Sequence, residues 1–317
     1  MKKYYLGIDT SAYTTSIAVV DKDRNIIFDN RKVLKVESRK KGLRQQDAVF
    51  QHLNNIPDII GDLTENIDVE KLDTVSVSAK PRNAKNSYMP VFVVGKGQAY
   101  IIAKMLNLHY KEFSHQEGHI GAAMMSNDLI YKDKFLAFHL SGGTTEVLLV
   151  NNKEKNFKID IIGGSLDISV GQLIDRIGVQ LGYRFPCGKK LDEISKNSSI
   201  IPLKYPIKTK GTWANFSGME NFFINLIQHE KYGEEQIIKT MFYTIGLMLE
   251  KLILGTCKKT NINTIVLIGG VASNSIIKEY LLGNLRKKGI NVFLTNNKLC
   301  TDNGVGVAYL GTIKDGH

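Results

Sequence analysis

The sequence holds few cysteines. Only Cys187, Cys257 and Cys300 occur among its 317 residues, and they are widely spaced and odd in number. This pattern fits neither a disulfide framework nor a zinc site of the CxxC type. It favours a reducing compartment, so we expect the protein in the cytoplasm.

Long hydrophobic runs are also missing. The longest, such as Thr264–Ile268 and Val91–Val94, are far shorter than the roughly 20 residues that span a bilayer. The N-terminus is basic and then apolar, but Asp9 interrupts the apolar stretch early. We therefore interpret it as a first strand rather than a signal peptide, and we expect no membrane as a partner.

Two common nucleotide-binding motifs are absent. The sequence has no GxxxxGK[ST] loop and no GxGxxG after a strand, which disfavours the P-loop and Rossmann classes. Acidic residues are in deficit, since 42 Lys and Arg outnumber 31 Asp and Glu and give a net charge of +11. Such a surplus favours an anionic partner, nucleic acid or nucleotide, although Lys-rich surfaces alone also explain it. The densest basic run is Arg31–Arg44.

The arrangement of the apolar segments indicates an α/β protein of two domains, because predicted strands alternate with predicted helices along the chain. Two predicted hairpins, Tyr4–Val20 and Phe135–Val150, have the same design and lie about 130 residues apart. Each consists of an apolar strand, a loop of small residues, and a second apolar strand. This repetition is expected of a duplicated domain.

Three loops are candidates for ligand contact: Asp9–Thr15, Ser141–Thr145 and Gly269–Asn274. Glycine lets the backbone approach a phosphate closely, and N–H and hydroxyl groups supply donors. The third loop lies between a strand and a helix, where the helix N-terminus favours an anion and Asn274 can bind ribose or base. Each loop alone is usually a plain turn. Together they match the two phosphate loops and the adenosine motif of actin-like ATPases.

A histidine pair is the sharpest local signal. His115 and His119 are four residues apart, so on a helix both project from one face and can chelate one cation. Glu117 does not directly follow the first histidine, so the metalloprotease motif HExxH lacks its spacing. Asp302 is a candidate third ligand. A set of two histidines and one aspartate with open positions suits Fe or Zn. The alternatives are a surface or core histidine pair and a helix N-cap at Asp302.

These residues carry a resemblance to a known family. His115–His119 matches its HxEGH, Gly269–Asn274 its GGVAxN, and Cys300–Asn303 its CTDN. Four shorter pieces follow the family's order: Leu6–Ser11, Ser141–Gly143, Gly171–Asp175 and Phe216–Gly218. The match runs from about residue 4 to 311, and the chain resembles the tRNA N6-threonylcarbamoyladenosine transferases.

The resemblance implies a fold and an activity. The fold would be the α/β fold of actin, hsp70 and the sugar kinases, with duplicated domains at residues 1–120 and 121–317 and a cleft between them. It leaves open that the C-terminal helix packs back on the first domain. The activity would be metal-assisted transfer of a threonylcarbamoyl group from threonylcarbamoyl-AMP to N6 of adenosine 37 in tRNA, and the partners would be tRNA and proteins of the transfer complex.

The resemblance also implies the site residues. One Fe or Zn per chain would be bound by His115, His119 and Asp302. ATP or an acyl-adenylate would be the bound nucleotide. The residues implied in contact with substrate or nucleotide are His139, Leu140, Ser141, Gly142, Gly143, Asp175, Gly188 and Asn274.

The sequence departs from the family beside the first loop. Where the family has Cys-Asp-Glu, this chain has Ala12-Tyr13-Thr14, so two carboxylates are missing. Neither replacement is a base at neutral pH, since tyrosine has a pKa near ~10. We expect nucleotide binding to persist and transfer to tRNA to be slow or redirected, unless Asp9 or Asp175 supplies the charge, and we assign no catalytic residue. The alternatives are a related carbamoyl or acyl transferase or an ATPase with another acceptor, and a nucleotide-binding paralogue without catalysis.

Overall fold

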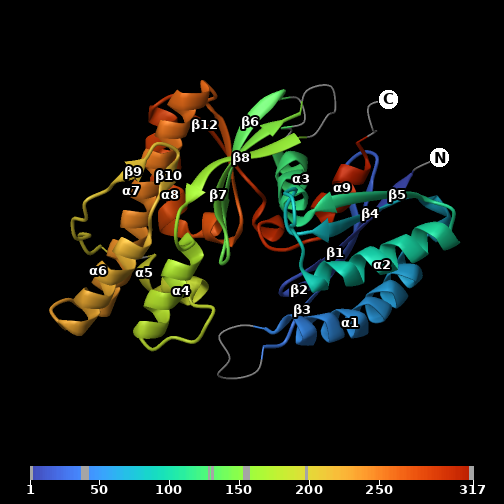
Figure 1. Cartoon of the computed structure of the whole chain (residues 1–317), viewed down its shortest axis with the longest axis horizontal. Coiled ribbons are helices and arrows are strands. Elements are labelled where there is room, and N and C mark those ends of the chain that lie inside the picture. The colour runs from blue at the N-terminus through green and yellow to red at the C-terminus, as the bar shows by residue number, and fades with distance from the viewer. Residues whose placement is uncertain are drawn as a thin grey trace. The chain divides into compact units, whose positions relative to one another are not determined.

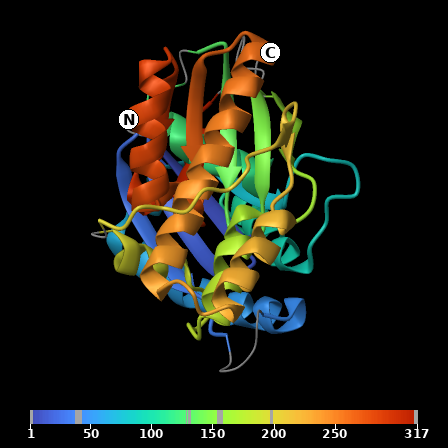
Figure 2. The same ribbon diagram turned by 90° about the vertical axis from the view of Figure 1, so that its left-hand side faces the viewer.

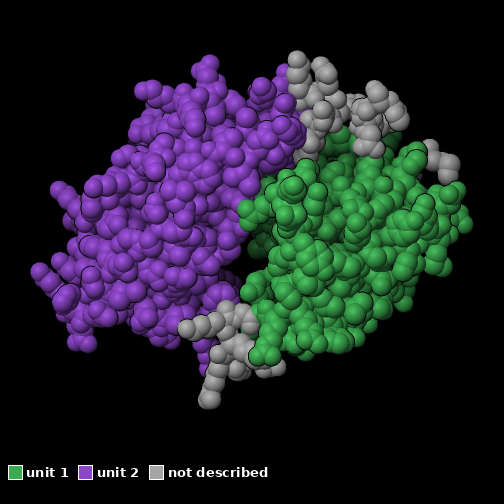
Figure 3. Space-filling model, viewed as in Figure 1, with its two compact units in different colours: residues 1–131, 153–156, 295–317 green, residues 132–152, 157–294 purple. Residues whose placement is uncertain are grey.

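The protein divides into two compact units. The computed structural model describes residues 3–36, 43–127, 129, 132–152, 158–196 and 199–313. Unit 1 comprises residues 1–131, 153–156 and 295–317, and unit 2 comprises 132–152 and 157–294 (Figure 3). Each unit contains one sheet.

The sheet of unit 1 has five strands in the order β3-β2-β1-β4-β5. They are β1 (Tyr4–Ser11), β2 (Thr14–Asp21), β3 (Ile26–Val33), β4 (Leu72–Lys80) and β5 (His109–Ser114). β1, β2 and β3 run antiparallel, whereas β4 and β5 run parallel to β1. The sequence predicts the central strands and misses β3 and β5. Both are edge strands with few buried residues, so they lack the apolar run that marks the centre of a sheet.

Helices cover both faces of this sheet (Figure 1). α1 (Gln45–Asn66) and α2 (Pro90–Met105) enclose the main core of unit 1, whose members include Leu6, Ile8 and Ile59. α3 (His115–Asn127) and α9 (Val305–Gly311) cover the other face of the sheet. There they pack in a smaller cluster with Ala18 and Val20 of β2, whereas Ile17 and Val19 of the same strand face the main core. The remaining short elements are the 3₁₀ turns Val69–Lys71 and Asn297–Leu299.

Glycines let α9 approach α3 and β1 closely. A Cβ at Gly306 would lie 1.9 Å from the Gly118 carbonyl oxygen, and one at Gly7 would lie 2.2 Å from the Gly304 carbonyl oxygen. No side chain fits at such distances. A Cβ at Gly118 would lie 2.8 Å from Val307 Cγ2, so the glycine of the HxEGH motif also has a packing role here.

The sheet of unit 2 has the order β12-β11-β6-β7-β8-β10-β9. Its strands are β6 (Lys134–Leu140), β7 (Thr145–Asn151), β8 (Lys158–Ser165), β9 (Thr209–Lys210), β10 (Trp213–Ala214), β11 (Thr264–Ile268) and β12 (Asn291–Leu294). As in unit 1, the first three strands of the unit are antiparallel and two later strands add on in parallel. The two sheets therefore share one five-stranded topology, as the paired hairpins predict. β8 was not predicted.

The helices of unit 2 enclose one large core. They are α4 (Val170–Gln180), α5 (Gly188–Ser195), α6 (Ser217–Gln228), α7 (Glu234–Thr260) and α8 (Ser275–Lys287), with a 3₁₀ turn at Gly270–Ser273. Figure 2 shows α7, the long helix drawn in orange, running along this unit. The sequence predicts a long helix at Gln236–Lys259, close to α7, and misses α6, whose start we interpreted only as the FSG motif.

The basic run is partly neutralised within unit 1. Arg31 forms an ion pair with Asp29 at 2.6 Å and donates to the Lys298 carbonyl oxygen at 2.6 Å, and Lys32 pairs with Asp58 at 2.6 Å. Residues 37–42 of the run lie outside the described residues. In the described part of the chain, no helix combines the length and apolar character that a membrane span requires.

Candidate functional site

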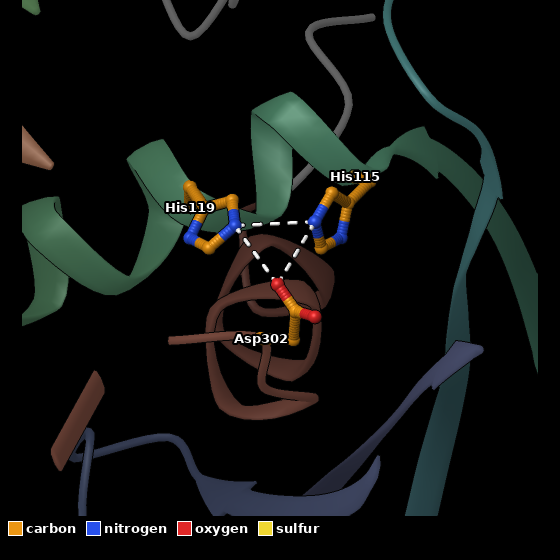
Figure 4. Close-up of side chains that lie close together, drawn as sticks. All are labelled: His115, His119 and Asp302. Atoms are coloured by element: carbon orange, nitrogen blue, oxygen red, sulfur yellow. Dashed lines mark hydrogen bonds and ion pairs between the residues drawn. The ribbon is translucent and has the colours of Figure 1, made fainter. Parts of the chain in front are cut away.

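The histidine pair lies on the first turns of α3. The helix begins directly after β5, where the Ser114 backbone N–H and hydroxyl donate to Glu117 at 2.6 and 2.7 Å, and the Glu117 N–H donates back to the Ser114 hydroxyl at 3.2 Å. This reciprocal pair satisfies donors at the helix start. Glu117 is thus a buried capping residue, which agrees with our exclusion of a metalloprotease base. His115 and His119 follow on one face of the helix (Figure 4).

Asp302 lies in a turn ahead of α9, not at its N-cap. The N-cap alternative would start a helix directly after Asp302, but α9 begins at Val305 with Gly304 as N-cap. The Asn303 side chain makes the bonds of this turn, accepting from the Gly306 N–H at 3.0 Å and donating to the Leu299 carbonyl at 3.0 Å. The alternative that Asp302 is a simple N-cap is therefore wrong, and its carboxylate is available to the histidines.

The three predicted ligands converge within unit 1. The Nε2 atoms of His115 and His119 are 3.1 Å apart, and Asp302 Oδ1 lies 3.3 Å from the first and 3.6 Å from the second (Figure 4). Atoms that share one ion at about 2.0–2.2 Å are separated by such distances. The side chains of His119 and Asp302 are 5% and 26% exposed, so the group is sheltered yet reachable. The donor set and spacing fit one divalent metal.

Charges reinforce this fit. Burial opposes ionisation of His115, but the carboxylates of Asp9 and Asp302 outweigh it and hold the pKa of His115 well above its ordinary value. Burial also disfavours the charged form of Asp302, yet hydrogen bonds from His115 and His119 hold the pKa of Asp302 well below its usual range. The carboxylate of Asp302 therefore stays ionised, which is the form that binds a metal.

The glycine loop of unit 2 joins β6 to β7. His139 and Leu140 are buried at the end of β6, and the turn closes with the Ser141 N–H donating to the Thr144 carbonyl at 2.8 Å. A Cβ at Gly142 or Gly143 would meet nothing within 4 Å. The backbone here is open to a ligand.

The remaining predicted contact residues gather around α4 and α5. Asp175 Oδ1 accepts from the Cys187 N–H at 2.7 Å and its carboxylate also bonds the Gly188 N–H. Burial, which outweighs these two bonds, raises the pKa of Asp175. One turn further along α5, Asp192 accepts from Asn274 Nδ2 at 2.8 Å.

Asn274, predicted to contact the nucleotide, also uses its side chain within the fold. Asn274 Oδ1 accepts from the Ile277 N–H at 3.0 Å and caps α8. Asp192 also accepts from the Ser275 hydroxyl at 2.7 Å, so it fixes the start of α8. Sequence reasoning missed Asp192, because its partners lie more than 80 residues away. Contact of Asn274 with a nucleotide stays a prediction.

Asp9 was also missed as a neighbour of the histidine pair. It is fully buried at the end of β1, and its Oδ1 lies 2.9 Å from His115 Nδ1. The sequence singles out Asp9 as part of the first loop and as a possible source of charge. The sequence separation of 106 between the two partners hides the contact from any local pattern.

A protein-family model decides the family. The model described as tRNA N6-adenosine threonylcarbamoyltransferase matches residues 27–309. The chain belongs to this family. The threonylcarbamoyltransferases are acyltransferases, so the resemblance and the enzyme class expected from the sequence are confirmed.

Curated relatives extend over nearly the whole chain. The tRNA N6-adenosine threonylcarbamoyltransferase of Metamycoplasma arthritidis is 31% identical over 313 residues, covering 96% of each chain. That of a Sulfurihydrogenibium species is 30% identical and covers 96% of this chain and 89% of the relative. That of Thermotoga neapolitana is 27% identical and covers 96% and 92%.

Solved structures confirm the fold class of this family member. A ROK family glucokinase from Streptomyces griseus matches with a TM-score of 0.55 at 9% identity, covering 98% of both chains. The (R)-2-hydroxyglutaryl-CoA dehydratase component A of Acidaminococcus fermentans matches at 0.57 and 13%, again over 98% of both. HypF of T. kodakarensis matches at 0.66 and 14%, over 98% of this chain and 48% of HypF. At such identities the likeness shows the fold alone.

Proposed function

We propose that the chain transfers a threonylcarbamoyl group from threonylcarbamoyl-AMP to N6 of adenosine 37 in tRNA, with one Fe or Zn bound by His115, His119 and Asp302. Membership of the family supports the transfer. The observation that carries the metal is the convergence of three ligand atoms from α3 and from the turn ahead of α9.

The metal ligands have separate tasks in this proposal. A bound divalent ion supplies Lewis-acid polarisation of a carbonyl or phosphoryl oxygen. His115 and His119 hold the ion from a rigid helix, and Asp302 contributes the negative charge. Both histidines would ligate through Nε2, and a set of three protein ligands would leave room for substrate oxygens on the ion.

Unit 2 would bind the adenylate. The open backbone at Gly142 and Gly143 offers N–H groups to phosphate, with His139, Leu140 and Ser141 shaping the loop. Asp175, Gly188 and Asn274 would complete this contact surface from α4, α5 and α8. The net charge of +11 supports tRNA as the acceptor, since Lys and Arg neutralise phosphates. Proteins of the transfer complex are proposed as further partners.

A second candidate function rests on the first loop. Ala12-Tyr13-Thr14 provides no carboxylate where the family has two. Transfer of a carbamoyl or acyl group to a different acceptor, or ATP hydrolysis, therefore stands as the alternative activity.

A transfer assay tests the proposal. Purified protein loaded with Fe(II) or Zn(II) is given threonylcarbamoyl-AMP and unmodified tRNA, and the modified nucleoside is measured by liquid chromatography and mass spectrometry. We expect product from the wild type and from Asp73→Asn, a change to a surface ion pair with Lys3, and a loss of at least about 100-fold for Asp302→Asn. Release of AMP without modified tRNA would favour the second function. Equal product from Asp302→Asn would contradict the metal.

A further inference from the structure

The carboxylate of Asp9 is buried beside the histidine pair. Asp9 is 0% exposed, and only one of its oxygens, Oδ1, has a hydrogen-bond partner among the described residues. A buried carboxylate with an unsatisfied oxygen is costly unless a nearby charge compensates it. Its partner, His115 Nδ1, lies 2.9 Å away. The burial of the Asp9 carboxylate is unfavourable by itself, which points to a functional role beside His115.

The fold fixes Asp9 rigidly relative to both ligand-bearing segments. Asp9 is paired across the sheet with Ser16, whose hydroxyl accepts from the Gly304 N–H at 2.8 Å. Gly7, two residues earlier on the same face of β1, lies in backbone contact with Gly304. The strand that carries Asp9 therefore also holds the turn that carries Asp302.

The two ring nitrogens of His115 face different partners. Nδ1 faces Asp9, whereas Nε2 faces His119 and Asp302 at 3.1 and 3.3 Å. An ionised carboxylate only accepts hydrogen bonds, so the proton of this contact lies on Nδ1. With Nδ1 protonated, Nε2 presents its lone pair to a metal.

We propose that Asp9 is a positioning residue that fixes the orientation and the Nδ1–H tautomer of His115, so that Nε2 binds the metal shared with His119 and Asp302. This inference rests on the metal in the proposed function. Hydrogen bonds from a metal-ligating histidine to a carboxylate raise the basicity of the ligand, and their loss weakens metal binding by about 10–100-fold. Asp9 thus acts on the metal site through His115, its hydrogen-bond partner.

The test measures Zn(II) affinity of the full chain by chelator competition, with folding followed by thermal melting. Asp9→Asn keeps the shape of the side chain and removes its charge, so we expect a dissociation constant about 10–100-fold higher. Ser76→Ala is the matched control, because Ser76 is a buried polar residue of the same sheet whose hydroxyl has no hydrogen-bond partner among the described residues. Its affinity should equal that of the wild type.

If Asp9→Asn does not fold, nuclear magnetic resonance of the wild type still tests the proposal, because it reports which ring nitrogen of His115 carries the proton. In the Zn(II)-loaded protein with ¹⁵N-labelled histidine, His115, assigned by the signals lost in His115→Gln, should carry its proton on Nδ1 and the metal on Nε2. The reverse assignment overturns the proposal. Unchanged affinity in a folded Asp9→Asn overturns it while the metal centre stands. A wild type that binds neither Zn(II) nor Fe(II) removes the metal centre of the proposed function and this inference with it.

Discussion

The same hairpin occurs in both units, but the two loops differ in how much backbone they leave accessible. In unit 1 the β1–β2 loop is enclosed: His52 contacts the Ser11 carbonyl through Nε2 at 2.9 Å and the Thr15 hydroxyl through Nδ1 at 2.8 Å. The Tyr13 carbonyl also accepts from the Leu34 N–H at 2.8 Å. In unit 2 the Ser169 hydroxyl holds the β6–β7 loop at the Gly142 carbonyl, at 2.7 Å, but the two glycines of this loop are exposed.

This difference indicates a division of tasks between two copies of one topology. The enclosed loop has its ends held by α1, and just before it the strand places a single carboxylate, Asp9, against His115. The open loop offers backbone N–H groups to whatever approaches. A duplicated sheet thus provides a rigid support for side chains in one unit and an accessible backbone surface in the other.

Removal of a metal ligand should give the largest effect, because it should abolish metal binding by unit 1 and leave nucleotide binding by unit 2 unchanged. We expect His115→Ala to reduce bound metal from one per chain to background, because only two ligands remain, while nucleotide binding by unit 2 is retained. Elemental analysis of purified protein and calorimetric titration with ATP measure the two properties. His109→Ala, which removes an exposed histidine of β5, serves as the control. Unchanged metal content in His115→Ala would refute the ligand assignment.

Carboxylates restored to the enclosed loop should raise the transfer rate. If the missing pair limits transfer, we expect Tyr13→Asp/Thr14→Glu to be faster by about 100-fold or more, the usual contribution of a general base. Tyr13 is 40% exposed and tolerates the change, whereas Thr14 is buried, so the single Tyr13→Asp variant is measured alongside.

Tyr88→Asp, at a position 69% exposed, is the control for added surface charge. Full activity of the wild type with no gain in the double variant would show that another group, such as Asp9 or Asp175, already supplies the charge.

A matched pair of glycine substitutions tests the contrast in packing. Gly306→Ala forces a methyl group against the Gly118 carbonyl, whereas Gly143→Ala meets nothing within 4 Å. We expect the first to lower the free energy of unfolding by about 1–3 kcal/mol or more and the second to change it by less than about 0.5 kcal/mol.

Urea denaturation followed by circular dichroism measures both variants. Gly143→Ala should nevertheless weaken ATP binding, because its methyl group occupies the open side of the loop. Equal destabilisation by the two changes would remove the distinction between enclosed and open glycines.

The smallest expected effect is a loss of folding stability in acid that comes from His52, which holds the β1–β2 loop. Burial, partly offset by the Ser11 carbonyl and Asp9, lowers the pKa of His52 below its ordinary 6.5. As the pH falls below about 6.5, His52 binds a proton in the unfolded chain but not in the folded protein. The free energy of unfolding therefore falls from that pH down to the folded-state pKa. The slope is at most about 1.4 kcal/mol per pH unit.

Urea denaturation at pH 7.5 and 5.5 measures this effect in the wild type and in His52→Gln, with the exposed His229→Gln as control. The loss of stability between the two pH values should be smaller in His52→Gln alone. An equal loss in all three proteins would assign the acid sensitivity to other groups.

Local patterns in the sequence predicted much of the fold. The paired hairpins, the helix Glu234–Thr260 and the glycine loops carry continuous apolar runs or turn residues, and these report directly on local structure. The spacing of His115 and His119 predicted their common face. The edge strands β3 and β5 were missed, since exposed strands mix polar and apolar residues with little periodicity.

Contacts between distant segments could not be predicted. Asp9 meets His115 and Asp192 meets Asn274 only after the sheets and helices have formed. Asp302 was named from the sequence as a candidate third ligand and then by the resemblance, but its place before α9 depends on the bonds of Asn303. The resemblance identified which residues matter, and the structure adds how they are supported.

The discontinuity of unit 1 sets an order of assembly during synthesis. Residues 1–131 carry both histidines, the whole of unit 2 follows, and Asp302 arrives only with residues 295–317. Domains generally fold as units while the chain emerges from the ribosome. A nascent chain stopped before residue 302 holds His115 and His119 without their carboxylate and without α9, against which α3 packs. Unit 2 is therefore synthesised before the two histidines can meet Asp302, so the group of three cannot form until residues 295–317 have joined unit 1.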